Sequence, residues 1–69
     1  MTGATIKRLR LEKGLTQEQL ATIAQLSQPT LSQYESGRVT PSLQAAKRIA
    51  RALGVSLDSL IDEPTEPAQ

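Results

Sequence analysis

Uncharged hydrogen-bonding side chains cluster in one stretch of this 69-residue sequence, AQLSQPTLSQYESG from residue 24 to 37. Wound as a helix at about 100° per residue, the stretch has two sides. One side groups Ser27, Thr30, Leu31 and Tyr34, and the other groups Gln28, Pro29, Ser32, Gln33 and Ser36. The second side is neutral and polar, so the chemistry that it offers is hydrogen bonding to a partner.

Such a face suits the floor of the DNA major groove. A glutamine amide there can contact adenine N6 and N7 together, and a serine hydroxyl can donate or accept. The alternative interpretation is ordinary surface polarity, although a solvated helix without a ligand more often carries Lys and Glu. The surrounding sequence distinguishes the two interpretations.

Caps and helix breakers predict an all-α domain of five short helices and no strand. Thr16 and Gln19 have the spacing of a capping box, and Ser27 is a good N-cap ahead of Pro29, which the first turn of a helix tolerates. The glycines at 14, 37 and 54 end helices. The expected helices cover about residues 5–13, 16–25, 27–37, 42–53 and 56–61, with Thr40 or Ser42 capping the fourth.

Only Gln25, Leu26 and Ser27 separate the second expected helix from the third. A connection this short forces the two helices to cross steeply, and Leu26 would fill the apolar contact at the crossing. One face of the third helix then protrudes from the domain. The protruding face is the neutral one, which carries Gln28 and Gln33.

The composition excludes several classes of protein. The sequence has no Cys and no His, so we expect no disulfide, no metal, no cofactor and no enzymatic activity. The core must be aliphatic, built from ten Leu, four Ile, two Val and eight Ala. No apolar run could span a membrane and the N-terminus lacks the pattern of a signal peptide, so we expect a cytoplasmic protein. No pocket for a small-molecule ligand is evident.

Charge is distributed unevenly along the chain. Residues 1–51 hold all eight Lys and Arg against three Glu, a net charge of +5, whereas residues 52–69 hold four acids and no base, a net charge of −4. A domain that binds a polyanion has this pattern, and so does a chain patterned only for solubility. We expect a domain over residues 1–62, followed by a disordered tail over 63–69.

Several segments resemble the helix-turn-helix domain of phage Cro and cI-type repressors. They are IKRLR from residue 6, GLTQEQLA from 14, LSQYESGR from 31, PSL from 41 and ALGVS from 52. The segments keep their mutual spacing over about residues 5–62, so the resemblance is more specific than any one motif. It implies a compact five-helix domain that enters the major groove of double-stranded DNA through its third helix and binds as a two-fold homodimer.

The resemblance also implies roles for individual residues. The residues implied to read bases are Gln28, Pro29, Ser32 and Gln33, of which Pro29 can offer only apolar contact. The residues implied to contact phosphates are Gln17, Ser27, Thr30, Arg38 and Ser42. Gln17 lies at a helix N-terminus that faces the DNA backbone, and Thr30 could instead belong to the edge of the core.

Three further expectations concern the fold. The resemblance implies that Arg10 and Glu35 pair with each other inside the domain rather than contact DNA. Relatives commonly have Gly where this chain has Gln25, a turn position that needs a positive φ at a cost of roughly 1 kcal/mol or somewhat more for another residue. The side chains of Leu57, Leu60 and Ile61 either complete the monomer core or form the dimer contact.

Together these features predict a sequence-specific transcriptional regulator, a repressor that reads a palindromic operator. The alternative is a helical protein-interaction module, antitoxin-like or adaptor-like, with little or no DNA binding. A phage repressor, a plasmid regulator and a restriction–modification controller are equally compatible with the residues.

Overall fold

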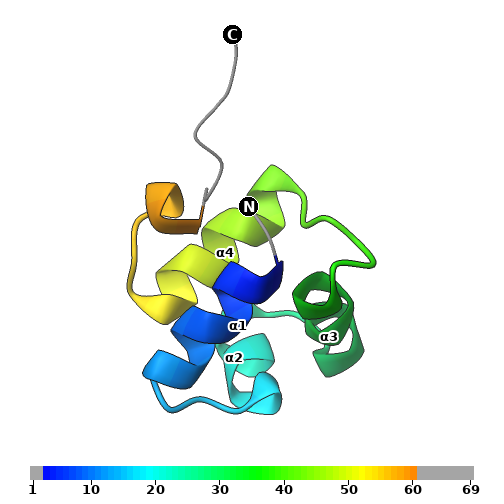
Figure 1. The fold of residues 1–69 in the computed structure, drawn as a ribbon, viewed down its shortest axis with the longest axis horizontal. Coiled ribbons are helices and arrows are strands. Elements are labelled where there is room, and N and C mark those ends of the chain that lie inside the picture. The colour runs from blue at the N-terminus through cyan, green and yellow to red at the C-terminus, as the bar shows by residue number, and fades with distance from the viewer. Residues whose placement is uncertain (1–2, 61–69) are drawn as a thin grey trace, which may run out of the picture.

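The computed structural model describes residues 3–60, which form an all-α domain (Figure 1). Its elements are α1 (Gly3–Glu12), α2 (Gln17–Ala24), α3 (Gln28–Ser36), α4 (Leu43–Leu53) and a short 3-10 helix, η1 (Leu57–Leu60). No strand is present over residues 3–60. The four α-helices match the first four helices expected from the sequence to within two residues at each end.

Side-chain caps explain where α2 and α3 begin. The Thr16 Oγ1 accepts a hydrogen bond from the Gln19 amide at 3.0 Å, and the Gln19 Oε1 accepts one from the Thr16 amide at 2.9 Å. The predicted capping box is therefore present. The Ser27 Oγ accepts from the Thr30 amide at 3.2 Å, and Pro29 occupies the first turn of α3.

The fourth helix begins after Ser42 and ends before Gly54. The Ser42 Oγ accepts from the Ala45 amide at 3.1 Å, so Ser42 rather than Thr40 is the N-cap. Gly54 has a φ of 71°, a left-handed conformation that closes the helix. The end of α4 is therefore sharp, and the chain turns back toward η1.

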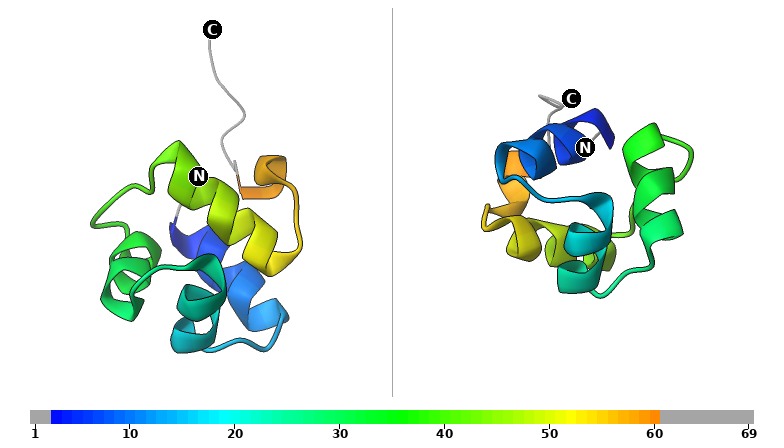
Figure 2. Two further views of the ribbon diagram at one scale, coloured as in Figure 1. Left: turned by 180° about the vertical axis from the view of Figure 1, so that it is seen from behind. Right: turned by 90° about the horizontal axis from the view of Figure 1, so that it is seen from below.

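Aliphatic side chains from all five elements meet in one core. The α2 helix packs against α3 and α4, α1 packs against α3 and α4, and η1 packs against α4 (Figure 2). The core residues are Ile6, Leu9, Leu20, Ala21, Ala24, Leu31, Ile49, Ala50, Leu53 and Leu60. Leu26 and Tyr34 are half-buried against this core, which agrees with the expectation that Leu26 fills the crossing of α2 and α3.

The α1 helix begins earlier than expected and approaches the end of α3 closely. A Cβ atom at Gly3 would collide with the backbone carbonyl oxygens of Tyr34 and Glu35. Glycine is the residue that permits two backbones to come this near. Sequence reasoning started this helix at about Thr5 and missed the contact of Gly3 with α3.

The expected fifth α-helix is not confirmed, because the four α-helices of the described chain are followed by a single 3-10 turn. A 3-10 helix has three residues per turn, so two leucines three positions apart lie on one side of it. This geometry points Leu57 and Leu60 toward the domain, where Leu60 is fully buried and Leu57 is half-buried. Ile61 and the expected tail over 63–69 lie outside the described residues.

Candidate nucleic-acid interface

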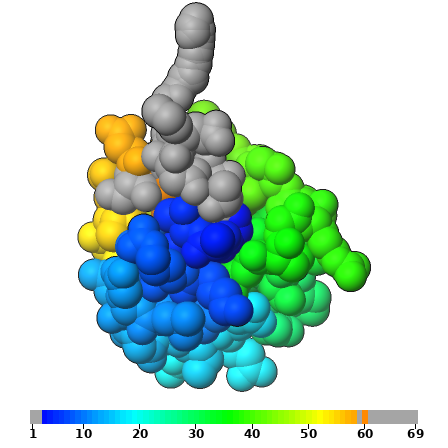
Figure 3. Space-filling model, viewed as in Figure 1, coloured from blue at the N-terminus to red at the C-terminus, as the bar shows by residue number. Residues whose placement is uncertain are grey.

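The neutral face of α3 lies at an edge of the domain. Figure 1 places α3 at one side of the bundle, and Figure 3 shows the surface of α3 and of the following loop forming that side. Leu31 is fully buried and anchors α3, while Gln28, Pro29 and Gln33 are exposed and Ser32 is half-buried. The structure therefore brings the four candidate base-reading residues together on the outer side of α3.

The corner between α2 and α3 contains the predicted left-handed residue. Gln25 has φ 61° and ψ 43°, and it is the one non-glycine residue with positive φ in the described part of the chain. The Leu26 amide donates to the Ala21 carbonyl oxygen at 2.8 Å. The prediction of a positive φ at Gln25 is confirmed.

Gln17 and Gln28, the first residues of α2 and α3, are in direct contact. The Gln28 Nε2 donates to the Gln17 Oε1 at 2.7 Å. The Gln28 amide keeps a second N–H and its oxygen, and these are the two groups that a bidentate contact to adenine needs. The contact therefore holds Gln28 without consuming the groups that would read a base.

A buried ion pair lies behind the two glutamines. Arg10 donates from Nε to the Glu35 Oε2 at 2.7 Å and from Nη2 to the Glu35 Oε1 at 3.1 Å. The Arg10 Nη1 also donates to the Leu15 carbonyl oxygen at 2.8 Å. The side chains of Arg10 and Glu35 are only 9% and 3% exposed. The two residues expected to pair within the domain therefore contact each other away from solvent.

Gln17 connects this ion pair to the surface of α3. The Gln17 Nε2 donates to the Glu35 Oε1 at 3.0 Å, while the Gln17 Oε1 accepts from Gln28. Sequence reasoning assigned Gln17 only to a phosphate contact. It missed both hydrogen bonds because their partners lie 11 and 18 positions further along the chain, where no helical periodicity relates them.

The other candidate phosphate-contacting residues lie at the two ends of α3 and at the start of α4. The hydroxyls of Ser27 and Thr30 are 2.7 Å apart, and Ser27 also caps the helix. The Ser42 Oγ accepts its cap amide, which leaves the hydroxyl proton for a second partner. Arg38 follows α3 directly and is exposed. These residues supply hydroxyl groups at the starts of α3 and α4 and one cation after the end of α3.

The three residues considered for a dimer contact differ in accessibility. Leu60 is fully buried in the monomer core, so its side chain completes the fold. Leu57 is half-buried and borders a shallow hollow that Ala50 and Val55 also line. Ile61 lies outside the described residues. Of the three, Leu57 is the described residue that keeps part of its apolar side chain accessible.

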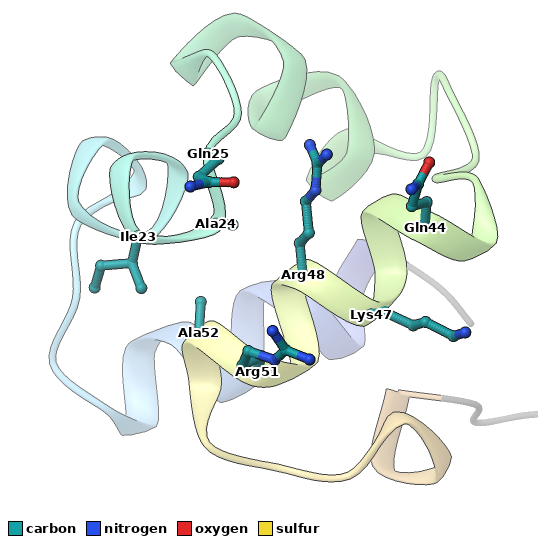
Figure 4. A pocket seen from close by; sticks show the side chains of 8 residues that line it. All are labelled: Ile23, Ala24, Gln25, Gln44, Lys47, Arg48, Arg51 and Ala52. Carbon is teal, nitrogen blue, oxygen red and sulfur yellow. The ribbon is translucent and has the colours of Figure 1, made fainter.

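A hollow of about 410 Å³ lies between α2 and α4 (Figure 4). Lys47, Arg48 and Arg51 line it from α4, and Gln25 lines it from the corner between α2 and α3. Sequence reasoning did not predict this hollow. Its three cations add positive charge beside the corner that holds α3, which favours anionic partners on this side of the domain.

The charges of residues 3–60 are predominantly positive, with eight Lys and Arg against four Asp and Glu, a net charge of +4. Two of the acids are paired, Glu35 with Arg10 and Glu12 with Arg8. Over the same residues, no group of three or more Asp and Glu is arranged to hold a metal ion, and no helix is long and apolar enough to cross a membrane.

Comparison with known proteins agrees with this geometry. A family model described as helix-turn-helix matches residues 6–60. The immunity repressor protein of Bacillus phage phi105 is 41% identical over 63 residues, which cover 91% of this chain and 44% of the repressor. An uncharacterized HTH-type transcriptional regulator of Sinorhizobium fredii is 42% identical over 66 residues, which cover 96% of this chain and 84% of that protein.

The solved structures give the same result for the fold. The N-terminal DNA binding domain of SinR from Bacillus subtilis superimposes with a TM-score of 0.82 at 37% identity, covering 93% of this chain and 94% of that one. The chain therefore belongs to the helix-turn-helix family of Cro- and cI-type repressors, as the spacing of its motifs predicted. It spans less than half of the phage repressor and most of the Sinorhizobium regulator.

Proposed function

We propose that this chain is a sequence-specific transcriptional regulator, a repressor that binds double-stranded DNA through α3. The observation that carries the proposal is the outer face of α3, where Gln28 and Gln33 are exposed while Leu31 is fully buried. The relatives support it, since they are named as an immunity repressor, a transcriptional regulator and a DNA binding domain.

In this proposal the outer face of α3 lies in the major groove. Gln28 and Gln33 contact base edges through their amides, each able to accept from adenine N6 and donate to adenine N7. Ser32 donates or accepts beside them. Pro29 has no N–H and contributes apolar contact, for example to a thymine methyl group.

Phosphate contacts fix the position of the domain on the duplex in the same proposal. The first turn of α2, with Gln17, and the first turn of α3, with Ser27 and Thr30, direct backbone and hydroxyl donors toward one strand. Arg38 and the start of α4 at Ser42 contact the backbone on the other side of α3. These contacts supply affinity and its salt dependence but carry no sequence information.

A two-fold homodimer completes the proposal. Two domains related by a two-fold axis place their third helices in successive major grooves about 34 Å apart, so the operator is palindromic. Leu57 and the hollow beside Ala50 and Val55 are the proposed apolar part of the dimer contact.

Selection of bound sequences from a pool of randomised duplexes tests the proposal, because it examines binding, symmetry and base preference together. We expect the selected sequences to converge on one palindromic site. A pool that binds without converging would contradict sequence-specific recognition. If no duplex is retained even at low salt, the chain is instead a helical protein-interaction module with an unused outer face on α3.

A further inference from the structure

The hollow between α2 and α4 combines exposed cations with exposed apolar surface. Lys47, Arg48 and Arg51 line it from α4, and all three side chains are exposed. Ile23 lines it from α2 and is 55% exposed, a large fraction for an isoleucine. Figure 4 shows the cations extending from α4 and Ile23 from α2. None of the described residues that line this hollow is acidic.

The three cations have no partner that neutralises them. Lys47 and Arg48 lie four and three positions before Arg51, so all three share one side of α4. The helix contains no acidic residue, and within residues 3–60 no ion pair or side-chain hydrogen bond engages any of the three. Like charges one turn apart on a helix repel each other. An anionic partner in the hollow would relieve this repulsion.

Ile23 also borders a second hollow, in which the charge has the opposite sign. Its lining residues are Leu15, Glu18, Gln19, Thr22 and Ile23. Leu15 is half-buried and adds apolar surface, whereas the carboxylate of Glu18 disfavours a second acid there. A ligand that crosses Ile23 is therefore favoured when its acidic part lies on the α4 side.

An acidic protein segment matches this surface better than a nucleic acid does. A segment in which Asp and Glu flank a large apolar side chain offers carboxylates to the cations and a hydrophobic group to Ile23, and arginine clusters are a recurring means of binding acidic motifs. A phosphate backbone would match the cations but has no apolar group for Ile23. No residue of α3 is among the described residues of the lining, so an occupant need not cover the outer face of α3.

We propose that the hollow between α2 and α4 is a docking site for an acidic segment of a partner protein. The segment places an apolar side chain against Ile23 and carboxylates against Lys47, Arg48 and Arg51. This site goes beyond DNA recognition, because none of its residues has a proposed contact with bases or phosphates. A domain bound to DNA through α3 would carry the partner on a different surface.

Selection from a displayed library of random peptides, with the domain as target and no DNA present, tests the proposal. We expect the enriched peptides to hold several Asp or Glu around a large apolar residue. The most enriched peptide is then labelled with fluorescein and titrated with the domain. Ile23→Ser should weaken its binding about tenfold, because the apolar contact is lost. Lys47→Glu should weaken it about fivefold, because an attraction becomes a repulsion.

Matched substitutions on α1 control for composition and net charge. Leu11→Ser removes an apolar side chain that is 58% exposed, and Lys7→Glu reverses the same charge as Lys47→Glu at another exposed position. Both controls should bind the peptide nearly as well as the wild-type domain. Added salt should weaken the wild-type complex more than the Lys47→Glu complex, since salt screens exposed charges. All four substitutions are at exposed positions, so we expect folded domains, which circular dichroism verifies.

Three outcomes would overturn the proposal. They are a selection that enriches no acidic peptide, equal losses in the variants of the hollow and in their controls, and a Lys47→Glu domain that loses duplex binding more than Lys7→Glu does while its peptide binding is unchanged. The last result would assign the cations to the DNA backbone. The selection of duplexes tests the proposed function separately, so either proposal can fail while the other stands.

Discussion

Arg10 on α1 and Glu35 on α3 are joined by two hydrogen bonds, Nε to Oε2 at 2.7 Å and Nη2 to Oε1 at 3.1 Å. The pair is almost excluded from solvent, so its charges are not screened by water. It connects the first helix to the helix that carries the proposed reading face. The pair also holds the loop after α1, because Arg10 donates to the Leu15 carbonyl oxygen.

Breaking this pair from one side should destabilise the domain strongly. In Arg10→Met the Glu35 carboxylate remains buried without its cation, and we expect the free energy of unfolding to fall by about 3–5 kcal/mol. Urea denaturation followed by circular dichroism measures the loss. The double variant with Glu35→Met should be more stable than Arg10→Met alone, since no charge is left unpaired. If the double variant has a lower free energy of unfolding than Arg10→Met, the two side chains stabilise the domain by more than the mutual neutralisation of their charges.

The substitution Gln33→Ala should weaken binding to the selected site by about 1–3 kcal/mol, because it removes a proposed base contact. Binding to unrelated duplexes should hardly change, since Gln33 contributes nothing to phosphate contacts in the proposal. Titration of both duplexes at one salt concentration provides the comparison. Thr22→Ala, at an exposed polar position of α2 with no proposed DNA contact, is the control and should affect neither. An equal loss on both duplexes would contradict base reading by Gln33.

Arg38→Ala should weaken binding to all duplexes alike and flatten the salt dependence. Removing one phosphate contact lowers the slope of log K against log salt by about 0.9. The matched control is Arg8→Ala, which removes the same charge from α1, where Arg8 is paired with Glu12 at 2.9 Å. We expect the control to change the slope much less. Equal changes in the two variants would indicate that only the net charge of the domain matters.

Local signals predicted much of the fold from the sequence. The capping box at Thr16 and Gln19, the cap at Ser27 and the glycines at 37 and 54 act within one helical turn, so their effects are visible in neighbouring residues. The positive φ of Gln25 was equally predictable, because the family that the chain resembles commonly has Gly at that turn position.

Contacts between distant parts of the chain were less accessible to sequence reasoning. The approach of Gly3 to the end of α3 depends on how α1 packs, and nothing near Gly3 in the sequence encodes it. The short η1 element was expected to be an α-helix, because the segment has helical caps and leucines but only tertiary packing selects the tighter turn.

The candidate site was predicted as a set of residues but not as a connected structure. The outer face of α3 followed from helical periodicity, and the pairing of Arg10 with Glu35 followed from the resemblance. The hydrogen bonds of Gln17 to Glu35 and Gln28 depend on how α2 crosses α3, to within about an ångström. Periodicity carries no information at that precision.

The substitution Gln25→Gly should stabilise the domain. Gln25 has a φ of 61°, which costs a residue with a Cβ atom about 1–2 kcal/mol, and glycine adopts this conformation without that cost. Part of the gain is lost because glycine is more flexible in the unfolded chain, so we expect a net increase of about 0.5–1 kcal/mol in the free energy of unfolding. Thermal and urea denaturation measure it. Lys47→Gly, at an exposed position in the interior of α4, should instead lower stability by about as much.

Gly3→Ala should destabilise the domain through a contact between backbones. The added Cβ would meet the carbonyl oxygens of Tyr34 and Glu35, which are backbone atoms and cannot move aside as the end of a flexible side chain would. Either α1 shifts away from α3 or its first turn unwinds, and we expect a loss of about 1–3 kcal/mol in urea denaturation.

The neighbouring substitution Ala4→Ser is the control for Gly3→Ala, since Ala4 is exposed in the same turn of α1 and should tolerate the change. A shift of α1 would also move Arg10 relative to Glu35, so Gly3→Ala combined with Arg10→Met should cost less than the two single losses added together. Strictly additive losses would show that the first turn unwinds while the rest of α1, with Arg10, stays in place against α3.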